Sequence, residues 1–332
     1  MRRTIRNLSI LTVLSLLVGS AFAGASPSAP AVKEDARGIV LSNDLVSFSF
    51  LDKKPVLVVR AAGNETDAFT YTFDQLVEYR DVDANGLPSD NEVVARLDLA
   101  AASYQVNQTT KGDAVVLNLT LTAPVKPTKT PAPAPGGVLD NLTLPNGDAQ
   151  VTLLFTLRNT ATTLKAGAAS LTIPASAVKY DLFVTKWPFI DSSMDRLALD
   201  MHASGVGEQA PGVGVESAVL ARNGTQVGAV SWSTLARGAT PQGATIDVPV
   251  RAVLKVQPSA NGTSETRIVY TYDAADVATL VHEATIGLAS ASIAEISSSG
   301  SVVGPTKDTP GAGVVAALGA LAVVGLLSRR RT

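Results

Sequence analysis

The sequence contains no cysteine, and this absence excludes several classes of protein at once. Without thiols the chain has no disulfide bond, no thiolate metal site and no cysteine nucleophile. Aromatic residues are scarce at 5%, and charged residues, at 17%, are too few for a disordered polyelectrolyte. By contrast, 46% of the 332 residues are hydrophobic, so the chain can bury a large core without covalent cross-links.

Enzyme fingerprints are also missing. The chain contains no G-x-S-x-G, H-E-x-x-H, phosphate-binding loop or dinucleotide motif. Its only two histidines, His202 and His282, have no recognised spacing to a nucleophile or to a second metal ligand. Whether the protein is an enzyme therefore stays open, and a structural or binding role is the first expectation.

The first 23 residues have the pattern of an export signal. Arg2, Arg3 and Arg6 precede an apolar run from Leu8 to Phe22, and Ala21-Phe22-Ala23 forms an A-x-A cleavage site. We therefore expect residues 1–23 to be a signal peptide and residues 24–36 to be a spacer before the folded part.

The other end has the pattern of a membrane anchor. A polar stalk is expected over residues 294–309, and Gly311 to Leu327 is a run of 17 mainly apolar residues, at the short end of bilayer-spanning length. Arg329, Arg330 and Arg331 follow directly and are expected to stay in the cytoplasm. This predicts a cell-surface protein held in the cytoplasmic membrane, with its C-terminus inside.

Residues 310–332 resemble the PGF-CTERM sorting signals of archaeal surface proteins. The resemblance rests on Pro310-Gly311, the Gly/Ala/Val/Leu run and the closing arginines, with Ala312 where the family has Phe. It implies processing by an archaeosortase-type enzyme and exchange of the tail for a lipid anchor. An uncleaved transmembrane helix is the alternative.

N-glycosylation sequons agree with an exterior location. Six of the 11 asparagines after residue 23 stand in N-x-T: Asn64, Asn107, Asn118, Asn141, Asn223 and Asn261. Without the six terminal arginines the body has 27 − 6 = 21 Lys and Arg against 29 Asp and Glu, a charge of −8. Such a surface attracts cations and repels nucleic acid, so no nucleic-acid partner is expected, and the extracellular ligand stays open.

Between the two ends, apolar residues recur at every second position, the period of a half-buried strand. Typical runs are Val46, Phe48, Phe50; Phe69, Tyr71, Phe73; Val115, Leu117, Leu119, Leu121; Val151, Leu153, Phe155, Leu157; Tyr180, Leu182, Val184; Leu197, Leu199, Met201; Val250, Ala252, Leu254, Val256; and Ile268, Tyr270, Tyr272. The prediction is an all-β, antiparallel β-sandwich over residues 37–293, either one large sandwich or two stacked ones. A Pro-rich loop is expected at residues 124–137, and a short helical turn at residues 274–282.

One segment carries a complete metal-binding pattern. Residues 81–92 read D-V-D-A-N-G-L-P-S-D-N-E and satisfy D-x-D-x-N-G-x5-E at every fixed position. The expected ligands are the side chains of Asp81, Asp83, Asn85 and Glu92, the carbonyl of Leu87, and Ser89 through a water.

These residues resemble the calcium loop of the EF-hand family, which implies a Ca²⁺ cofactor. The flanking residues have strand rather than helix periodicity, and the chain holds no second loop of this kind. We therefore expect a solitary structural calcium site rather than a paired sensor.

Two functional classes follow from these observations. The first is a membrane-anchored surface protein for envelope structure, adhesion or ligand binding. The second is a surface-anchored hydrolase acting on extracellular polysaccharide or peptide. A hollow that gathers His202 or His282 with two carboxylates would favour the hydrolase, and an exposed Trp187 or Trp232 would favour sugar stacking.

Overall fold

The computed structural model describes residues 29–64, 68–128, 147–166, 169–190, 196–208, 217–258, 264–273 and 277–289. The predicted signal peptide, polar stalk and C-terminal anchor lie outside these residues, as do Asn141 and Asn261. Within the described residues every regular element is a strand, and no apolar helix of membrane-spanning length occurs.

The strands of the N-terminal part follow one another closely. They are β1 (Ala31–Asp35), β2 (Gly38–Ser42), β3 (Val46–Leu51), β4 (Val56–Ala61), β5 (Ala68–Tyr79), β6 (Val93–Asp98), β7 (Gln105–Lys111), β8 (Ala114–Pro124) and β9 (Lys126–Pro127). Strand β1 lies within the predicted spacer, and residues 124–127, which open the predicted Pro-rich loop, end β8 and form β9.

The C-terminal part adds the remaining strands. They are β10 (Asp148–Arg158), β11 (Thr162–Ala166), β12 (Ala169–Ile173), β13 (Ala177–Thr185), β14 (Arg196–Ser204), β15 (Gly207–Glu208), β16 (Ser217–Arg222), β17 (Thr225–Trp232), β18 (Leu235–Ala239), β19 (Thr245–Pro258), β20 (Ser264–Tyr272) and β21 (Thr279–Leu288). The prediction of an all-β, antiparallel fold is confirmed.

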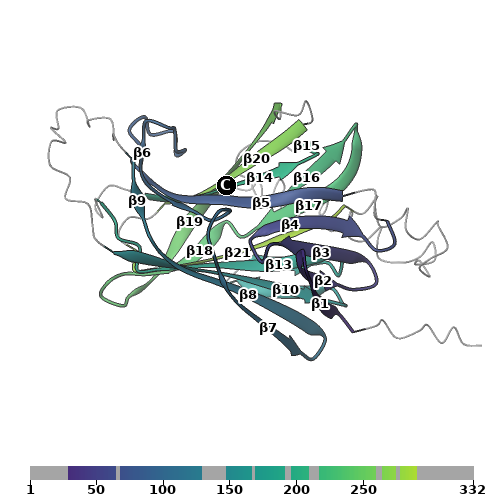
Figure 1. The fold of residues 1–332 in the computed structure, drawn as a ribbon. Coiled ribbons are helices and arrows are strands. Elements are labelled where there is room, and N and C mark those ends of the chain that lie inside the picture. Colours follow the sequence, from purple (N-terminus) through teal and green to yellow (C-terminus); the bar gives the residue numbers. More distant parts are fainter. Residues whose placement is uncertain are drawn as a thin grey trace, which may run out of the picture.

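Nineteen of these strands form one large antiparallel sheet, and β11 and β12 pair separately. The sheet folds back on itself, so that two groups of strands face each other (Figure 1). One group runs β1-β2-β3-β4-β5-β14-β20-β19, and the other runs β7-β8-β10-β13-β21-β17-β16. Strand β18 pairs with β21 and so belongs to the second group. Strand β19 connects the two groups, because its residues up to Pro249 pair with β18 and those from Val250 onward pair with β20.

The core lies between the two groups of strands. Its side chains are the inward members of the alternating runs, for example Val46, Phe48 and Phe50 on β3, none of which is exposed. Phe155 of β10 packs edge-on against Phe50 of β3, with ring centroids 4.7 Å apart, and against Phe73 of β5 at 5.7 Å. The period of two in the sequence is thus explained by one buried and one exposed face on each strand.

Two details of the strand prediction are wrong. Val256, predicted to face the core at the end of the run in β19, is exposed. Of the helical turn expected at residues 274–282, residues 274–276 lie outside the described residues, and from Thr279 onward the chain forms strand β21 instead. Leu280, His282 and Ala284 are buried alternately with half-buried neighbours, so the apolar pair Leu280-Val281 is split between the two faces of a strand.

We expect Phe155→Ala to lower the free energy of unfolding by about 3 to 5 kcal/mol, because it leaves a cavity where the two groups of strands meet. Phe183→Ala is the matched control: Phe183 faces outward on the adjacent strand β13 and is half-buried, so its loss should cost about 1 kcal/mol. Guanidinium unfolding followed by tryptophan fluorescence measures both. Equal losses of unfolding free energy in the two variants would show that Phe155 does not hold the two groups of strands together.

Candidate metal centre

Residues 80–92 connect β5 to β6 and fold back over the outer face of the sheet. Five apolar side chains form a small second core there: Val77, Tyr79, Val93, Ala198 and Val269. The Tyr79 hydroxyl donates a hydrogen bond to the carbonyl of Gly86 in the middle of the loop, at 3.3 Å. The loop is therefore attached to the sheet at Gly86, while residues 82–85 before it are exposed.

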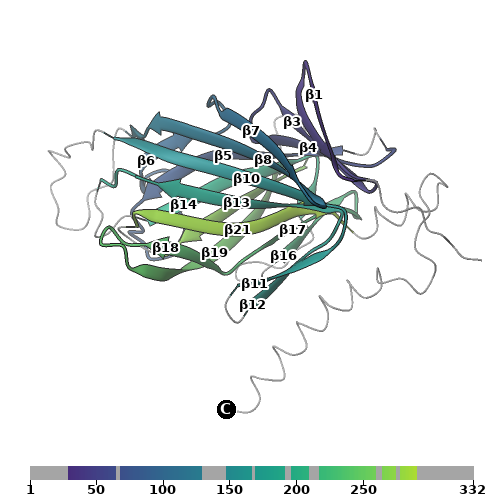
Figure 2. The same ribbon diagram turned by 90° about the horizontal axis from the view of Figure 1, so that it is seen from below.

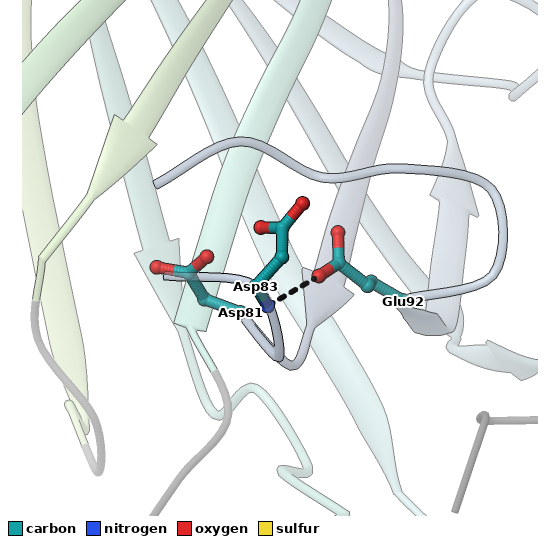
Figure 3. Close-up of side chains that lie close together, drawn as sticks. All are labelled: Asp81, Asp83 and Glu92. Carbon is teal, nitrogen blue, oxygen red and sulfur yellow. Dashed lines mark hydrogen bonds between the residues drawn. The ribbon is translucent and has the colours of Figure 1, made fainter. Parts of the chain in front are cut away.

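Three carboxylates meet in this loop. Asp81, Asp83 and Glu92 each place an oxygen within 4.8 Å of the others, a group that could hold a metal ion (Figure 3). Glu92 is nine residues beyond Asp83 in the sequence. The backbone N–H of Glu92 bonds to the Ser89 carbonyl, and the Glu92 carbonyl accepts from the N–H of Arg80, so that Glu92 lies beside the two aspartates. Asp83 is exposed, Asp81 is half-buried and Glu92 is buried.

Glu92 is held by four donors in the loop. Its Oε1 accepts from the backbone N–H of Val82 at 2.9 Å and of Asp83 at 3.4 Å, and its Oε2 accepts from the N–H and hydroxyl of Ser89 at 3.0 and 2.5 Å. Burial opposes ionisation of Glu92, but these hydrogen bonds together outweigh it and lower the pKa of the carboxyl group. Glu92 is thus ready to act as an anionic ligand.

The remaining predicted ligand residues support the bend. The amide of Asn85 donates to Asp83 at 2.6 Å, and its Oδ1 accepts from the backbone N–H of Leu87 at 2.6 Å. The N–H of Gly86 donates to both oxygens of Asp81, at 3.0 and 3.1 Å. Gly86 has φ +76°, a conformation that favours glycine, and a Cβ there would lie 2.7 Å from Arg251.

A contact that the loop sequence does not reveal is the one with Arg196 of β14. Its Nη1 lies 2.8 Å from Oδ2 of Asp81, and its Nη2 lies 3.3 Å from Oδ1 of Asp273. The guanidinium offsets part of the negative charge of the triad, while a carboxylate with several lone pairs still has room for a second partner. Only the outward position of Arg196 on its strand could have been inferred from the sequence, not its partner.

The two histidines have different surroundings. His282 is fully buried; its Nε2–H donates to the Ser233 carbonyl at 3.0 Å, and its Nδ1 accepts from the Tyr272 hydroxyl at 3.1 Å. Burial lowers the pKa of His282 to about 4, against the opposing effect of the Ser233 carbonyl. His282 is therefore a neutral core residue.

His202 lies on the outer face. The pairing of β5 with β14 has a bulge that leaves Asp74 as an extra residue, and Oδ2 of Asp74 lies 2.6 Å from Nδ1 of His202. This hydrogen bond raises the pKa of His202, although burial opposes it. Burial also raises the pKa of Asp74, with the bond to His202 acting in the opposite direction.

A shallow hollow beside the loop is lined by Leu87, Pro88, Val253, Lys255, Arg267 and Val269. Arg267 is already bound to Asp200 through two bonds of 2.8 Å. Trp187 and Trp232, considered above for sugar stacking, are both buried, so that hypothesis is wrong for them.

A comparison with protein-family models and with curated proteins finds no match for this sequence.

The bond between His202 and Asp74 predicts a pH dependence of stability. Because the pKa of His202 is raised in the folded state, its contribution is complete below the unfolded value of about 6.5 and is lost as pH rises through the folded value. The difference in Tm between the wild-type chain and His202→Gln should therefore shrink as pH rises above about 6.5. The pKa of His282 is about 4, so this second histidine does not titrate in the same pH range and does not contribute to the change. A difference that is constant with pH would contradict the assignment.

Proposed function

We propose that the chain is an exported, glycosylated surface protein, anchored to the cytoplasmic membrane near its C-terminus. Its β-sandwich ectodomain carries a structural calcium site in the loop of residues 81–92, and it serves in envelope structure, adhesion or ligand binding. The observation that carries the proposal is the loop itself: a full D-x-D-x-N-G-x5-E pattern whose three carboxylates converge on the outer face of the sheet.

The ligand chemistry favours calcium. Hard cations take oxygen ligands, and Ca²⁺ accepts more of them, in a more flexible geometry, than Mg²⁺. Apart from the triad, Asn85, the Leu87 carbonyl and Ser89 are available in the same twelve residues, and the loop contains no nitrogen or sulfur ligand. Calcium at a surface site would connect Asp81 and Asp83, which follow β5, to Glu92, which precedes β6.

The proposed role of the ion is to stiffen this connection. Without a cation, carboxylates this close repel one another, and Arg196 offsets only part of that charge. With a cation, the loop would cover Val77, Tyr79 and Val269 permanently. The site would therefore protect the outer face of the sheet rather than perform chemistry.

A surface-anchored hydrolase remains the alternative because of one observation, the hydrogen bond between Asp74 and His202. An imidazole oriented by a carboxylate is a common general base. The hollow beside the loop is lined by Arg267 and Val269 among others, but by neither member of this pair. The binding or structural role is therefore favoured.

Calcium is expected to raise the Tm of the full chain. For an affinity of about 10⁻⁴ to 10⁻³ M, 10 mM calcium stabilises the folded state by about 1.4 to 2.7 kcal/mol, or about 3 to 10 °C. Asp83→Asn should abolish the shift in Tm, because it removes one of the three carboxylates of the site. The fold should stay intact, because Asp83 is exposed and bonded mainly to Asn85. Asp90→Asn is the matched control, since it removes one charge from the same loop outside the triad. A Tm that does not move with calcium would remove the ion from the proposal.

The anchor is tested by deleting residues 310–332. The full chain is expected in the membrane fraction, and the truncated chain in the medium, because the truncated chain lacks the apolar run. Fractionation followed by immunodetection measures the distribution. Recovery of the full chain from the soluble cell interior, with both ends intact, would contradict export and anchoring together.

A further inference from the structure

The inference concerns the hairpin of β7 and β8, which carries two of the sequons. Asn107 of β7 and Asn118 of β8 are direct partners in the strand register, so their side chains stand beside each other on one face. That face is the outer one, because Leu117 and Leu119 of β8 point into the core. The two acceptors form a doublet rather than two independent sites.

Strand β7 is an edge of the sheet that lacks the usual protection. Among the described residues it pairs with β8 alone, and its seven register pairs run without a bulge from Gln105 to Lys111. Six of its seven residues are exposed. It contains no proline, and its one charge is Lys111 at the end, next to the turn at Gly112, so its exposed backbone groups are open to pairing with another chain.

The other short or terminal strands carry charges or prolines or are very short, as β19 shows with Arg251, Lys255 and Pro258 and β16 with Arg222. Strand β1 carries three charges in five residues, Lys33, Glu34 and Asp35. Strands β9 and β15 have two residues each, and β9 consists of a lysine and a proline. In β7 the sequon Asn107-Gln108-Thr109 occupies the middle of the strand, which carries no charge.

The surroundings of the doublet suit a sugar. The hydroxyl of Thr120, the third residue of the Asn118 sequon, donates to Oδ1 of Asn118 at 3.0 Å, and it lies 3.2 Å from the hydroxyl of Thr152 on β10. Leu154 is the partner of Asn118 on β10 and is half-buried on the outer face. A sugar on Asn118 would cover this apolar side chain with its own C–H groups.

We propose that Asn107 and Asn118 form a paired N-glycan acceptor whose oligosaccharide covers the β7 edge and prevents two copies of this chain from pairing edge to edge. The proposal rests on the proposed export and glycosylation. An incoming strand would lie about 4.8 Å from β7, with its own outward side chain directly opposite Asn107. A sugar attached to Asn107 occupies that position.

The modification is a group transfer from a lipid phosphate-linked oligosaccharide. Nδ2 of the asparagine bonds to the anomeric carbon of the sugar, and the bond from that carbon to the phosphate oxygen breaks. The lipid phosphate leaves as an anion, and the amide loses one proton. Because neighbouring strands are about as far apart as a pyranose ring is wide, a sugar on one asparagine crowds the other. We expect one glycan on most hairpins, and it blocks an incoming strand directly where it is attached to Asn107.

The test uses the full chain purified in mild detergent from cells that glycosylate it. Glycopeptide mass spectrometry is expected to find the hairpin peptide modified. Light scattering after size exclusion is expected to find the wild-type chain monomeric and the variant Asn107→Gln with Asn118→Gln associated, with onset at a concentration at least about tenfold lower. Asn223→Gln is the matched control, because it removes an exposed sequon in the turn between β16 and β17, away from β7.

Two further variants separate edge pairing from a folding defect. Thr109→Ala with Thr120→Ala removes both sequons without changing an asparagine and should associate in the same way. Asn107→Lys with Asn118→Gln also lacks both acceptors but places a charge on the edge, and it should be monomeric again. A double variant that stays as monomeric as Asn223→Gln would overturn the proposal, as would association that the lysine does not reverse.

The mass spectra also separate this proposal from the proposed function. Modification at Asn223 or Asn64 with an unmodified hairpin would overturn only the paired acceptor. An entirely unmodified chain would overturn both this proposal and the glycosylation in the proposed function.

Discussion

The packing of Phe155 against Phe50 and Phe73 is the interaction on which the rest of the structure depends. These rings join the two groups of strands directly, and no disulfide shares that task, because the chain has no cysteine. Hydrogen bonds connect the two groups through β19, but a shared strand alone would not hold their inner faces together. Burial of the alternating apolar side chains closes it, and this fixes the outer face on which the loop of residues 81–92 lies.

The loop shows how a local motif and a distant strand combine in one site. Asp83, Asn85 and Gly86 form their bonds within a few residues, so the bend is encoded locally. The place of the bend on the sheet also depends on Tyr79, which directly precedes the loop, and on Arg196 of the distant strand β14. The hydrogen bonds within the loop and the contacts with Tyr79 and Arg196 together keep the carboxylates close. They offset the electrostatic repulsion between the like charges.

The sequence predicted those strands that have one face buried in the core and the other face toward solvent. Strands β3, β8 and β10 have this alternation and were predicted at the right residues. Strand β7 was missed because nearly all of it is exposed, so its position depends only on pairing with β8. The partner of Asp81 and the bulge at Asp74 could not be predicted, because both depend on the register between β5 and β14, strands far apart in the chain.

Strand β21 has a mechanical consequence. It lies in the middle of its group, bonded to β13 along one side and to β17 and β18 along the other (Figure 2). It is also the last described strand, so any tension on the chain beyond residue 289 enters the body there. Because inter-strand hydrogen bonds are perpendicular to the strands, such tension loads two rows of them in shear, and they must break together rather than one at a time. The last described strand therefore lies where a force along it is shared by two rows of hydrogen bonds.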